Sequence, residues 1–300
     1  MVFDADMTLL GTYENQERSA WNFHYGSTEH HPQMRFNAIN GDFIRAQLRE
    51  GTKYCCTDIA DFMEPIFREF TEDYPFTNLF FRADSGYATL ELYEQCEEYG
   101  AWYAIRLKSN KSLLALAEGL DDRLAEMTGD DMVSYVAVYG EFMYRADSWG
   151  KARRVCCKVE KPVRSIEHRF TFIVTNMGDT LEFVVGFYCR RGQMENFIKE
   201  CKDDFDFSAV SSWSMAVNDN RLQIHVLVYI IFNIMCRLVF PHSMRKSRME
   251  TVHRNLVKVA SRIVRHGRWV IYRLCSNCPF RDEFVQILHN IYQLNATYII

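Results

Sequence analysis

This sequence of 300 residues lacks the features that mark several classes of protein. Its first ten residues, MVFDADMTLL, contain two acids and no basic residue, so they do not resemble a secretory signal. The strongly apolar segment 226–236 is too short to cross a bilayer and predicts a buried core helix. The chain has no internal repeat, low-complexity tract or flexible linker. We therefore expect a globular, cytoplasmic protein with no membrane partner.

Cysteine is present, but not in the pattern of a structural zinc site. Ten cysteines are unremarkable in a chain of this length, and we expect reduced thiols. Cys275 and Cys278 form a lone C-x-x-C without a second pair, so a zinc site there is short of ligands. His289 is a conceivable extra ligand, but the pattern does not favour zinc.

The net charge of −4 hides an uneven distribution. Residues 244–273 contain nine lysines and arginines and a single acid, Glu250. We predict an amphipathic helix over 244–266. Its cations lie in a row on the face opposite the apolar one: Arg254, Lys258, Arg262 and Arg265. An acidic body with such a basic segment is typical of a protein that holds metal in one place and a phosphate backbone in another. The alternative is an ordinary solvated helix face.

The order of the predicted elements is that of an α/β protein. Three strands come first, and helices and strands then alternate. We predict strands at 2–10, 34–39, 43–48, 78–83 and 102–107, and helices at 58–72 and 89–99. Asn40-Gly41 joins the second and third strands as a hairpin. Residues 11–32 are expected to be a long loop with little regular structure.

We divide the chain into four parts. Residues 1–110 form the first part of the α/β core, and 188–240 supply its closing helices. Between them, 111–187 begin with a helix and then change to strand-like runs, which predicts a separable β-rich insertion. The last part, 241–300, is a basic and mainly helical C-terminal region.

Three acids occupy positions where a site is expected. Asp4 and Asp6 share one face of the first strand, and two acids on one strand face imply a solvent-facing edge or a site. Asp84 follows a buried central strand, at the carboxyl end where open sheets place their sites. The alternative for Asp84 is an N-cap of the helix that follows.

The third acid, Glu195, lies in the segment YCRRGQMENFIKECKDD. Read as a helix over 188–204, this segment has one longitudinal stripe: Tyr188, Arg191, Glu195 and Lys202. A single carboxylate then stands among cations, beside an apolar stripe suited to packing on a sheet. Taken alone, Arg191 and Glu195 are equally well interpreted as an ordinary surface ion pair.

A strand acid, a strand-end acid and a helix acid, with a β-rich block between the last two, resemble transposases of the DDE type. The helix matches their Tyr-x2-Arg-x3-Glu-x6-Lys signature at every specified position. FRADSGYATLELYEQCEEYGAWYAIRLKSN, residues 81–110, resembles the second-acid block of bacterial insertion-sequence transposases, in particular the insertion-sequence 1380 family. VFDADMT resembles the first-acid strand, where an Asp stands two residues before a Thr. This resemblance selects Asp6 over Asp4.

The resemblance implies a ribonuclease-H-like mixed sheet flanked by helices, with the insertion between the second and third acids. It implies that Asp6, Asp84 and Glu195 bind two Mg²⁺ ions, with Mn²⁺ as a substitute, because carboxylates are the oxygen ligands such ions prefer. Tyr188, Arg191 and Lys202 are then expected to contact phosphates. The expected partners are transposon-end and target DNA and a second copy in a synaptic homodimer, in a bacterial cytoplasm.

Members of this family usually carry an N-terminal domain that recognises the terminal repeats, and we expect it to be missing here. Two other interpretations therefore stay open. One is a nuclease or resolvase with the same core. The other is an inactive copy that binds DNA or the full-length transposase as an inhibitor.

Overall fold

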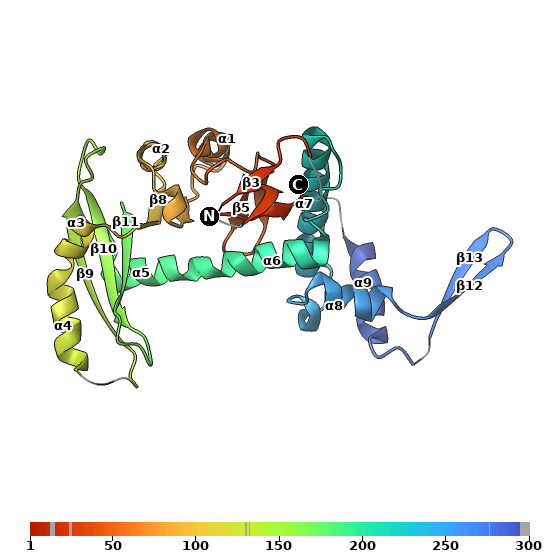
Figure 1. The fold of residues 1–300 in the computed structure, drawn as a ribbon. Helices are drawn as coiled ribbons and strands as arrows, with labels where there is room; N and C mark the ends of the chain where they lie inside the picture. Colours follow the sequence, from red (N-terminus) through yellow and green to blue (C-terminus); the bar gives the residue numbers. More distant parts are fainter. Residues whose placement is uncertain (13–15, 24–25, 130, 132, 276, 295–300) are drawn as a thin grey trace.

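The computed structural model describes residues 1–12, 16–23, 26–129, 131, 133–275 and 277–294. Its centre is a mixed sheet of eight strands (Figure 1). From one edge to the other the strands are β6 (Phe43–Gln47), β5 (Gln33–Asn37), β1 (Val2–Met7), β7 (Phe80–Ala83), β8 (Trp102–Leu107), β11 (Arg169–Thr175), β10 (Arg153–Lys161) and β9 (Val136–Tyr144). The three central strands β1, β7 and β8 are parallel, and every other pairing is antiparallel.

Successive side chains of β1 point to opposite faces of the sheet, and the two faces differ in character. Phe3, Ala5 and Met7 point into a core formed with α1 (Ile59–Glu72) and α2 (Leu90–Glu98). The residues between them, Asp4 and Asp6, point to the opposite face, which carries the helices of the segment 181–205. The first strand therefore has one apolar face and one acidic face, as the sequence predicts.

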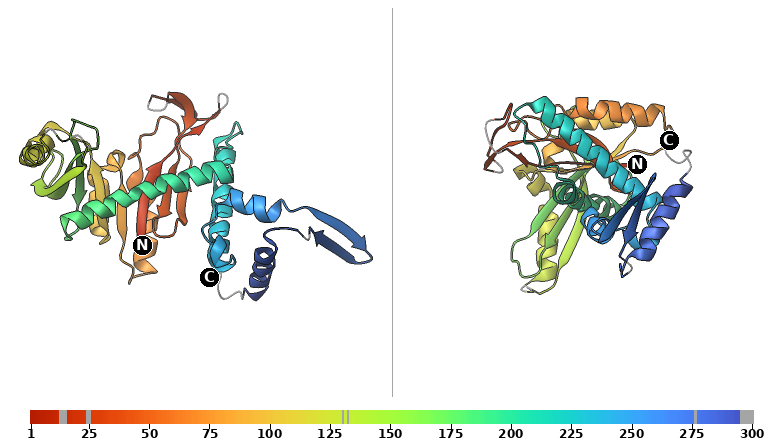
Figure 2. Two further views of the ribbon diagram at one scale, coloured as in Figure 1. Left: turned by 90° about the horizontal axis from the view of Figure 1, so that it is seen from below. Right: turned by 90° about the vertical axis from the view of Figure 1, so that its right-hand side faces the viewer.

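The helical segment on that second face is longer than predicted. It consists of α5 (Leu181–Cys189), the short 3-10 turn η2 (Arg190–Gly192) and α6 (Gln193–Phe205). Seen from below, this segment crosses the strands of the sheet (Figure 2). Its α5 part packs on β8, β9 and β10, and its α6 part contributes Met194 and Ile198 to a second core with β5 and β6.

The hairpin predicted around Asn40-Gly41 is present as β5 and β6. Gly41 has φ +74°, and a Cβ at that position would come within 2.9 Å of the Phe197 ring. Glycine is therefore required there both by the backbone conformation and by the close approach of α6. Through this contact the turn of the hairpin packs against α6, the helix that carries Glu195.

Two expectations are wrong, one for the block 111–187 and one for the loop 11–32. The block 111–187 does not form a separate unit, because β11 pairs with β8 and β9–β11 simply extend the sheet. Its helices are α3 (Lys111–Leu116) and α4 (Glu118–Thr128). Of the expected loop 11–32, residues 13–15 and 24–25 lie outside the described residues. Much of the rest forms a small sheet with the order β2 (Leu10–Gly11), β4 (Ser27–His30) and β3 (Ala20–Asn22).

The helix predicted over 244–266 forms only over residues 249–257, and the chain beyond it forms a hairpin in place of the predicted helix. The structure has η3 (His242–Met244), α8 (Met249–Val252) and a single π-helical turn, η4 (His253–Val257). A hairpin of β12 (Ser261–His266) and β13 (Trp269–Leu274) follows, and α9 (Arg281–Gln293) closes the described chain. Arg254, Lys258 and Arg262 are exposed but do not share one helix face. The β-branched run Ile263-Val264 and the turn at Gly267, with φ +55°, explain the preference for a hairpin.

The apolar segment 226–236 lies within α7 (Met215–Leu238), a helix of 24 residues. By length and composition alone this helix could cross a membrane, so the argument from shortness does not hold for the whole helix. Leu222, Val226, Tyr229 and Phe232 lie on the side that packs in the second core. The other side exposes apolar residues: Ile224, Leu227, Val228, Ile231, Ile234 and Leu238.

A buried ion pair links the central strands to the helical segment. Arg82 on β7 donates from Nε and Nη2 to the two carboxylate oxygens of Asp4 at 2.7 and 2.8 Å, and the side chains are 3% and 0% exposed. Arg82 also donates from Nη1 to the Phe187 carbonyl at 2.6 Å, and its guanidinium lies over the Phe187 ring. One side chain therefore holds β1, β7 and α5 together, and Asp4 has a structural role.

We predict that Arg82→Met destabilises the protein by about 3–5 kcal/mol, because it leaves the Asp4 carboxylate buried without its partner. The double variant Asp4→Leu/Arg82→Met should recover most of that loss, since no charge is then stranded. Urea unfolding at neutral pH measures both. As the control, Lys53→Met breaks the exposed Lys53–Asp58 pair and should cost less than about 1 kcal/mol. Equal losses for Arg82→Met and Lys53→Met would contradict the structural role of the buried pair.

Candidate active site

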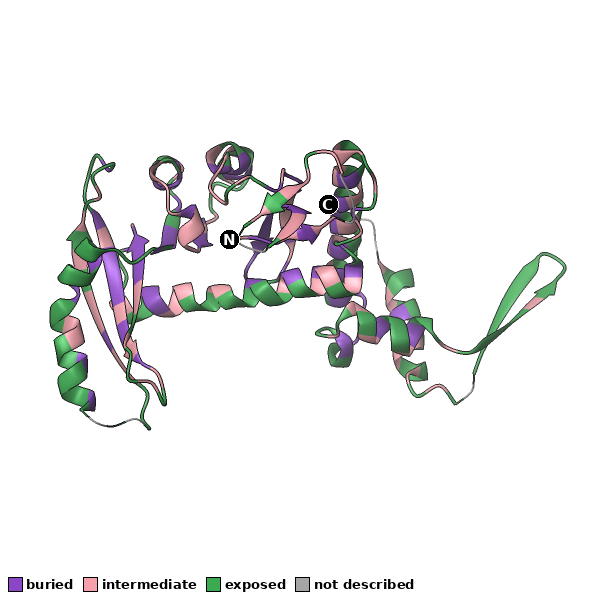
Figure 3. Ribbon diagram, viewed as in Figure 1, coloured by how far each residue is buried: buried purple, intermediate pink, exposed green. Residues whose placement is uncertain are grey.

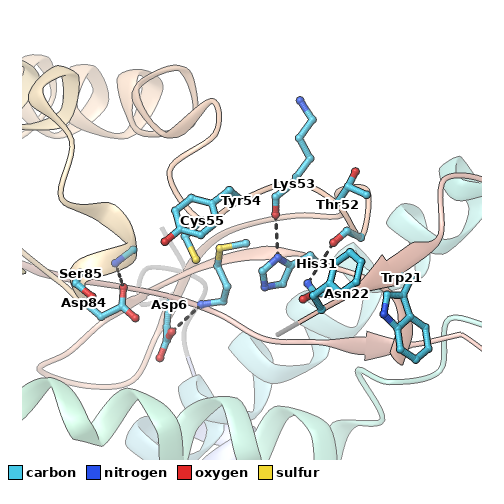
Figure 4. Close-up of a pocket in the computed structure, with 14 residues that line it drawn as sticks. Asp6, Trp21, Asn22, His31, Thr52, Lys53, Tyr54, Cys55, Asp84 and Ser85 are labelled. Carbon is cyan, nitrogen blue, oxygen red and sulfur yellow. Dashed lines mark hydrogen bonds between the residues drawn. The ribbon is translucent and has the colours of Figure 1, made fainter. Parts of the chain in front are cut away.

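Asp6 and Asp84 come together at the carboxyl ends of two adjacent parallel strands. Ala5 on β1 is in register with Ala83 on β7, so the next residue on each strand is an acid. Both acids line a cavity of about 510 Å³ (Figure 4). Its other walls are formed by residues of the small sheet and of the loop after β6, among them Trp21, His31 and Tyr54.

The backbone holds both carboxylates in place. Asp6 Oδ1 accepts a hydrogen bond from its neighbour Met7 N at 2.9 Å, and Asp84 Oδ1 accepts one from Gly86 N at 2.9 Å (Figure 4). The second bond makes Asp84 the N-cap of the 3-10 turn η1 (Ser85–Tyr87), whereas helix α2 is capped by Thr89. The capping alternative for Asp84 is thus realised in part, and the same side chain still lines the cavity.

Arg191 lies against this pair of acids. Its Nη1 donates to Asp6 Oδ2 at 3.1 Å, and both side chains are largely buried. Arg191 therefore pairs with the strand acid, and the interpretation as a surface pair with Glu195 is wrong. Burial raises the pKa of Asp6, Arg191 lowers it, and the charge of Asp84 raises it further. Burial lowers the pKa of Arg191, but Asp6, Tyr188 and Asp84 outweigh it and raise that pKa.

The other three residues of the Tyr-Arg-Glu-Lys signature, Tyr188, Glu195 and Lys202, differ in how far they are buried. Tyr188 is half-buried; burial raises its pKa and Arg191 lowers it, so the two side chains are electrostatic neighbours. Glu195 is exposed in the first turn of α6. Lys202 is half-buried near Glu29, and burial lowers its pKa. Within the part of the chain that the structure describes, no three His, Cys, Asp or Glu residues are grouped so that they could hold a metal ion.

A family profile described as "Transposase DDE domain group 1" matches residues 1–296. The chain belongs to this family. No curated protein matches the sequence. Among solved structures, the chain is similar to a piggyBac transposase in a synaptic complex with hairpin DNA, with a TM-score of 0.49 and 12% sequence identity. That similarity covers 84% of this chain and 51% of the other, so the chain spans about half of the other protein's length.

The sequence patterns did not identify the cavity wall of this transposase domain that faces the two acids. Trp21 on β3 and Phe23 just after it are exposed and line the cavity with Lys53 and Tyr54. Cys55 lines it too, and burial together with the charge of Asp84 raises the pKa of its thiol to about 11. The signal available in the sequence was the aromatic and polar character of residues 11–32, which indicates a functional loop but not its position.

We predict that Arg191→Gln raises the pKa of Asp6 in the transposase domain, because the substitution removes the cation that lowers it. Asp6 will then stay protonated to a higher pH. Carbon-detected NMR titration of ¹³C-labelled aspartates, with the Asp6 signal assigned from Asp6→Asn, measures the change. Arg190→Gln is the matched control, since Arg190 is adjacent in sequence and exposed. An Asp6 titration that is the same in all three proteins would contradict the pairing.

Proposed function

We propose that this transposase domain cleaves DNA phosphodiester bonds with divalent metal ions and transfers the strand at the ends of an insertion sequence. The observation that carries the proposal is the pair of acids, Asp6 and Asp84, at the carboxyl ends of adjacent parallel strands in one cavity. Arg191 pairs with Asp6 beside this cavity. Membership of a transposase family makes DNA the natural substrate.

The proposed fold of the core is ribonuclease-H-like. In its support, the first five strands of the sheet have the order β6-β5-β1-β7-β8, with an antiparallel meander on one side and parallel strands on the other. The complete Tyr-Arg-Glu-Lys signature supports placement in the insertion-sequence 1380 family.

Two of the three proposed metal ligands fit an oxygen-preferring cation. The two acids supply carboxylate oxygens, the ligands that Mg²⁺ and Mn²⁺ prefer, on rigid strand ends. Glu195 enters the proposal through the helix signature, because it stands one helical turn beyond Arg191 on the face of the sheet that carries the acids. When bound, a divalent ion supplies Lewis acidity and neutralises charge on the leaving oxygen.

The cations of the helix are proposed phosphate ligands. Arg191 offers a bidentate fork held near the acids, Tyr188 a hydroxyl donor, and Lys202 a point charge about two turns beyond Glu195 along α6. The pairing with Asp6 keeps the Arg191 guanidinium charged and in place. Arg254, Lys258 and Arg262 remain proposed DNA contacts from the C-terminal region, and transposition in a bacterial cytoplasm by a synaptic homodimer remains the proposed setting.

A second candidate is a DNA-binding inhibitor without cleavage activity. The exposed position of Glu195 favours it, because a site with two acids and an arginine can bind a phosphate while failing to hold a full complement of metal. A nuclease with the same core is distinguished from a transposase by its product: only a transposase joins the cut strand to target DNA.

We predict that Asp6→Asn, Asp84→Asn and Glu195→Gln each lower Mg²⁺-dependent nicking of supercoiled DNA by about 10³-fold or more. Losing a metal ligand removes several kcal/mol of transition-state stabilisation, and about 4 kcal/mol corresponds to that factor. Agarose gels of nicked plasmid measure the rate, and labelled target DNA detects strand transfer.

The control is Glu182→Gln, an exposed acid in the first turn of α5, which should nick at the wild-type rate. Nicking by Glu195→Gln at that same rate would remove Glu195 from the site. A wild-type chain that binds DNA but never nicks it in Mg²⁺ or Mn²⁺ would favour the inhibitor.

A further inference from the structure

The hairpin β12–β13 is the least buried sheet of the described molecule. It projects from the body beyond α8 and α9, and it is exposed along almost its whole length (Figures 1 and 3). No residue of either strand is buried, and Val264 alone among them is half-buried. An isolated two-stranded hairpin is marginal in water, so a surface that covers one of its faces would stabilise it.

The charges of the hairpin all have one sign. Residues 261–274 contain four arginines and no acid, while the whole chain has a net charge of −4. Two of the arginines, Arg262 and Arg273, are directly opposite each other across the two strands. Like charges at such a cross-strand pair destabilise a hairpin. Among the described residues neither arginine has an ion-pair partner that would offset this repulsion, and an external anion would do so.

The two faces of the hairpin differ in what lies beside them. Ser261, Tyr272 and Leu274 share one face, and they line an apolar groove with α9 residues such as Phe284 and Leu288. That face is turned toward the chain's own C-terminal helix at the base of the hairpin. The opposite face has the two paired arginines at its base, Val264 and Ile271 in the middle, and His266 and Trp269 at its tip. We define these six residues as the arginine face.

We propose that the arginine face lies in the major groove of duplex DNA. The inference rests on the proposed function, because it names the surface by which this domain holds DNA away from the cutting site. A partner of dense, regularly spaced negative charge satisfies both arginines at once, as adjacent phosphates do. The major groove, about 12 Å wide, admits a two-stranded ribbon whose strands are about 5 Å apart.

The dimensions and the apolar residues fit the same partner. Six residues of strand extend about 20 Å, which is the length of about six base pairs. Arginines at the base of the ribbon then contact phosphates at the groove edge, and Trp269, 74% exposed at the tip, reaches base edges or sugar. Val264 and Ile271 provide apolar contact of the kind that thymine methyl groups accept.

The test compares binding of a generic 30-base-pair duplex by the wild-type chain and by Arg262→Gln/Arg273→Gln, measured by fluorescence anisotropy over a salt series in EDTA. Removing two phosphate contacts should weaken binding about 10-fold or more near 0.1 M salt. The plot of log binding constant against log salt concentration should become less steep, its slope falling in magnitude by about two. Arg262→Lys/Arg273→Lys keeps the charge and should keep most of the slope. Thermal unfolding of the glutamine variant should be unchanged or shifted upward, because the like-charge pair is gone.

The control Lys111→Gln/Arg123→Gln removes two exposed cations from α3 and α4 and should leave the salt slope unchanged. An unchanged slope in the hairpin variant, or an equal loss in the control, overturns the proposal. Loss of self-association in sedimentation velocity, with DNA affinity intact, also overturns it and assigns the face to a second copy of the chain. Since binding is measured without metal, failure of this test and failure of the nicking test are separate results.

Discussion

The geometry of the site depends on the buried ion pair between Asp4 and Arg82. Arg82 lies on β7; its guanidinium neutralises Asp4 on β1 and also donates to the carbonyl of Phe187 on α5. These three elements carry, within a few residues, Asp6, Asp84 and Arg191. Removing one partner of a buried ion pair costs several kcal/mol. The pair therefore fixes β1, β7 and α5 firmly relative to one another. A rigid site needs its reactive side chains to be held by buried neighbours, and here the Asp4–Arg82 pair holds the elements that carry the three site residues.

The same pair separates two acids that look alike in sequence. Asp4 and Asp6 share a strand face, but Asp4 has both oxygens committed to one arginine and no contact with water. Asp6 is two residues nearer the strand end, where the sheet opens into the cavity, and its partner Arg191 comes from the turn between α5 and α6. Strand alternation alone could not distinguish them, because the distinction depends on Arg82, which is 78 residues away from Asp4 in sequence. Similarity to the first-acid strand of known transposases had pointed to Asp6.

The parts of the fold that the sequence predicts correctly are those with local signals. The Asn40-Gly41 hairpin, the helix α1 with its apolar spacing and the continuous apolar strand β7 all have such signals within ten or fifteen residues. The errors are of two kinds. Joining β11 to β8 is a pairing across more than 60 residues, which no local pattern encodes. In the basic segment 244–266, helical spacing of cations competed with β-branched residues and a glycine turn, and the turn chemistry prevailed.

What remains to be explained is why the fold tolerates two acids at one half-buried place with a single arginine between them. Desolvation and the charge of Asp84 both raise the pKa of Asp6, so the folded chain holds this carboxylate at a cost in stability. Arg191 offsets one negative charge and leaves the other. A purely structural role would be met at lower cost by an apolar pair or by a second cation, as at Asp4. The excess of negative charge at these two strand ends supports the proposal that a divalent cation binds there.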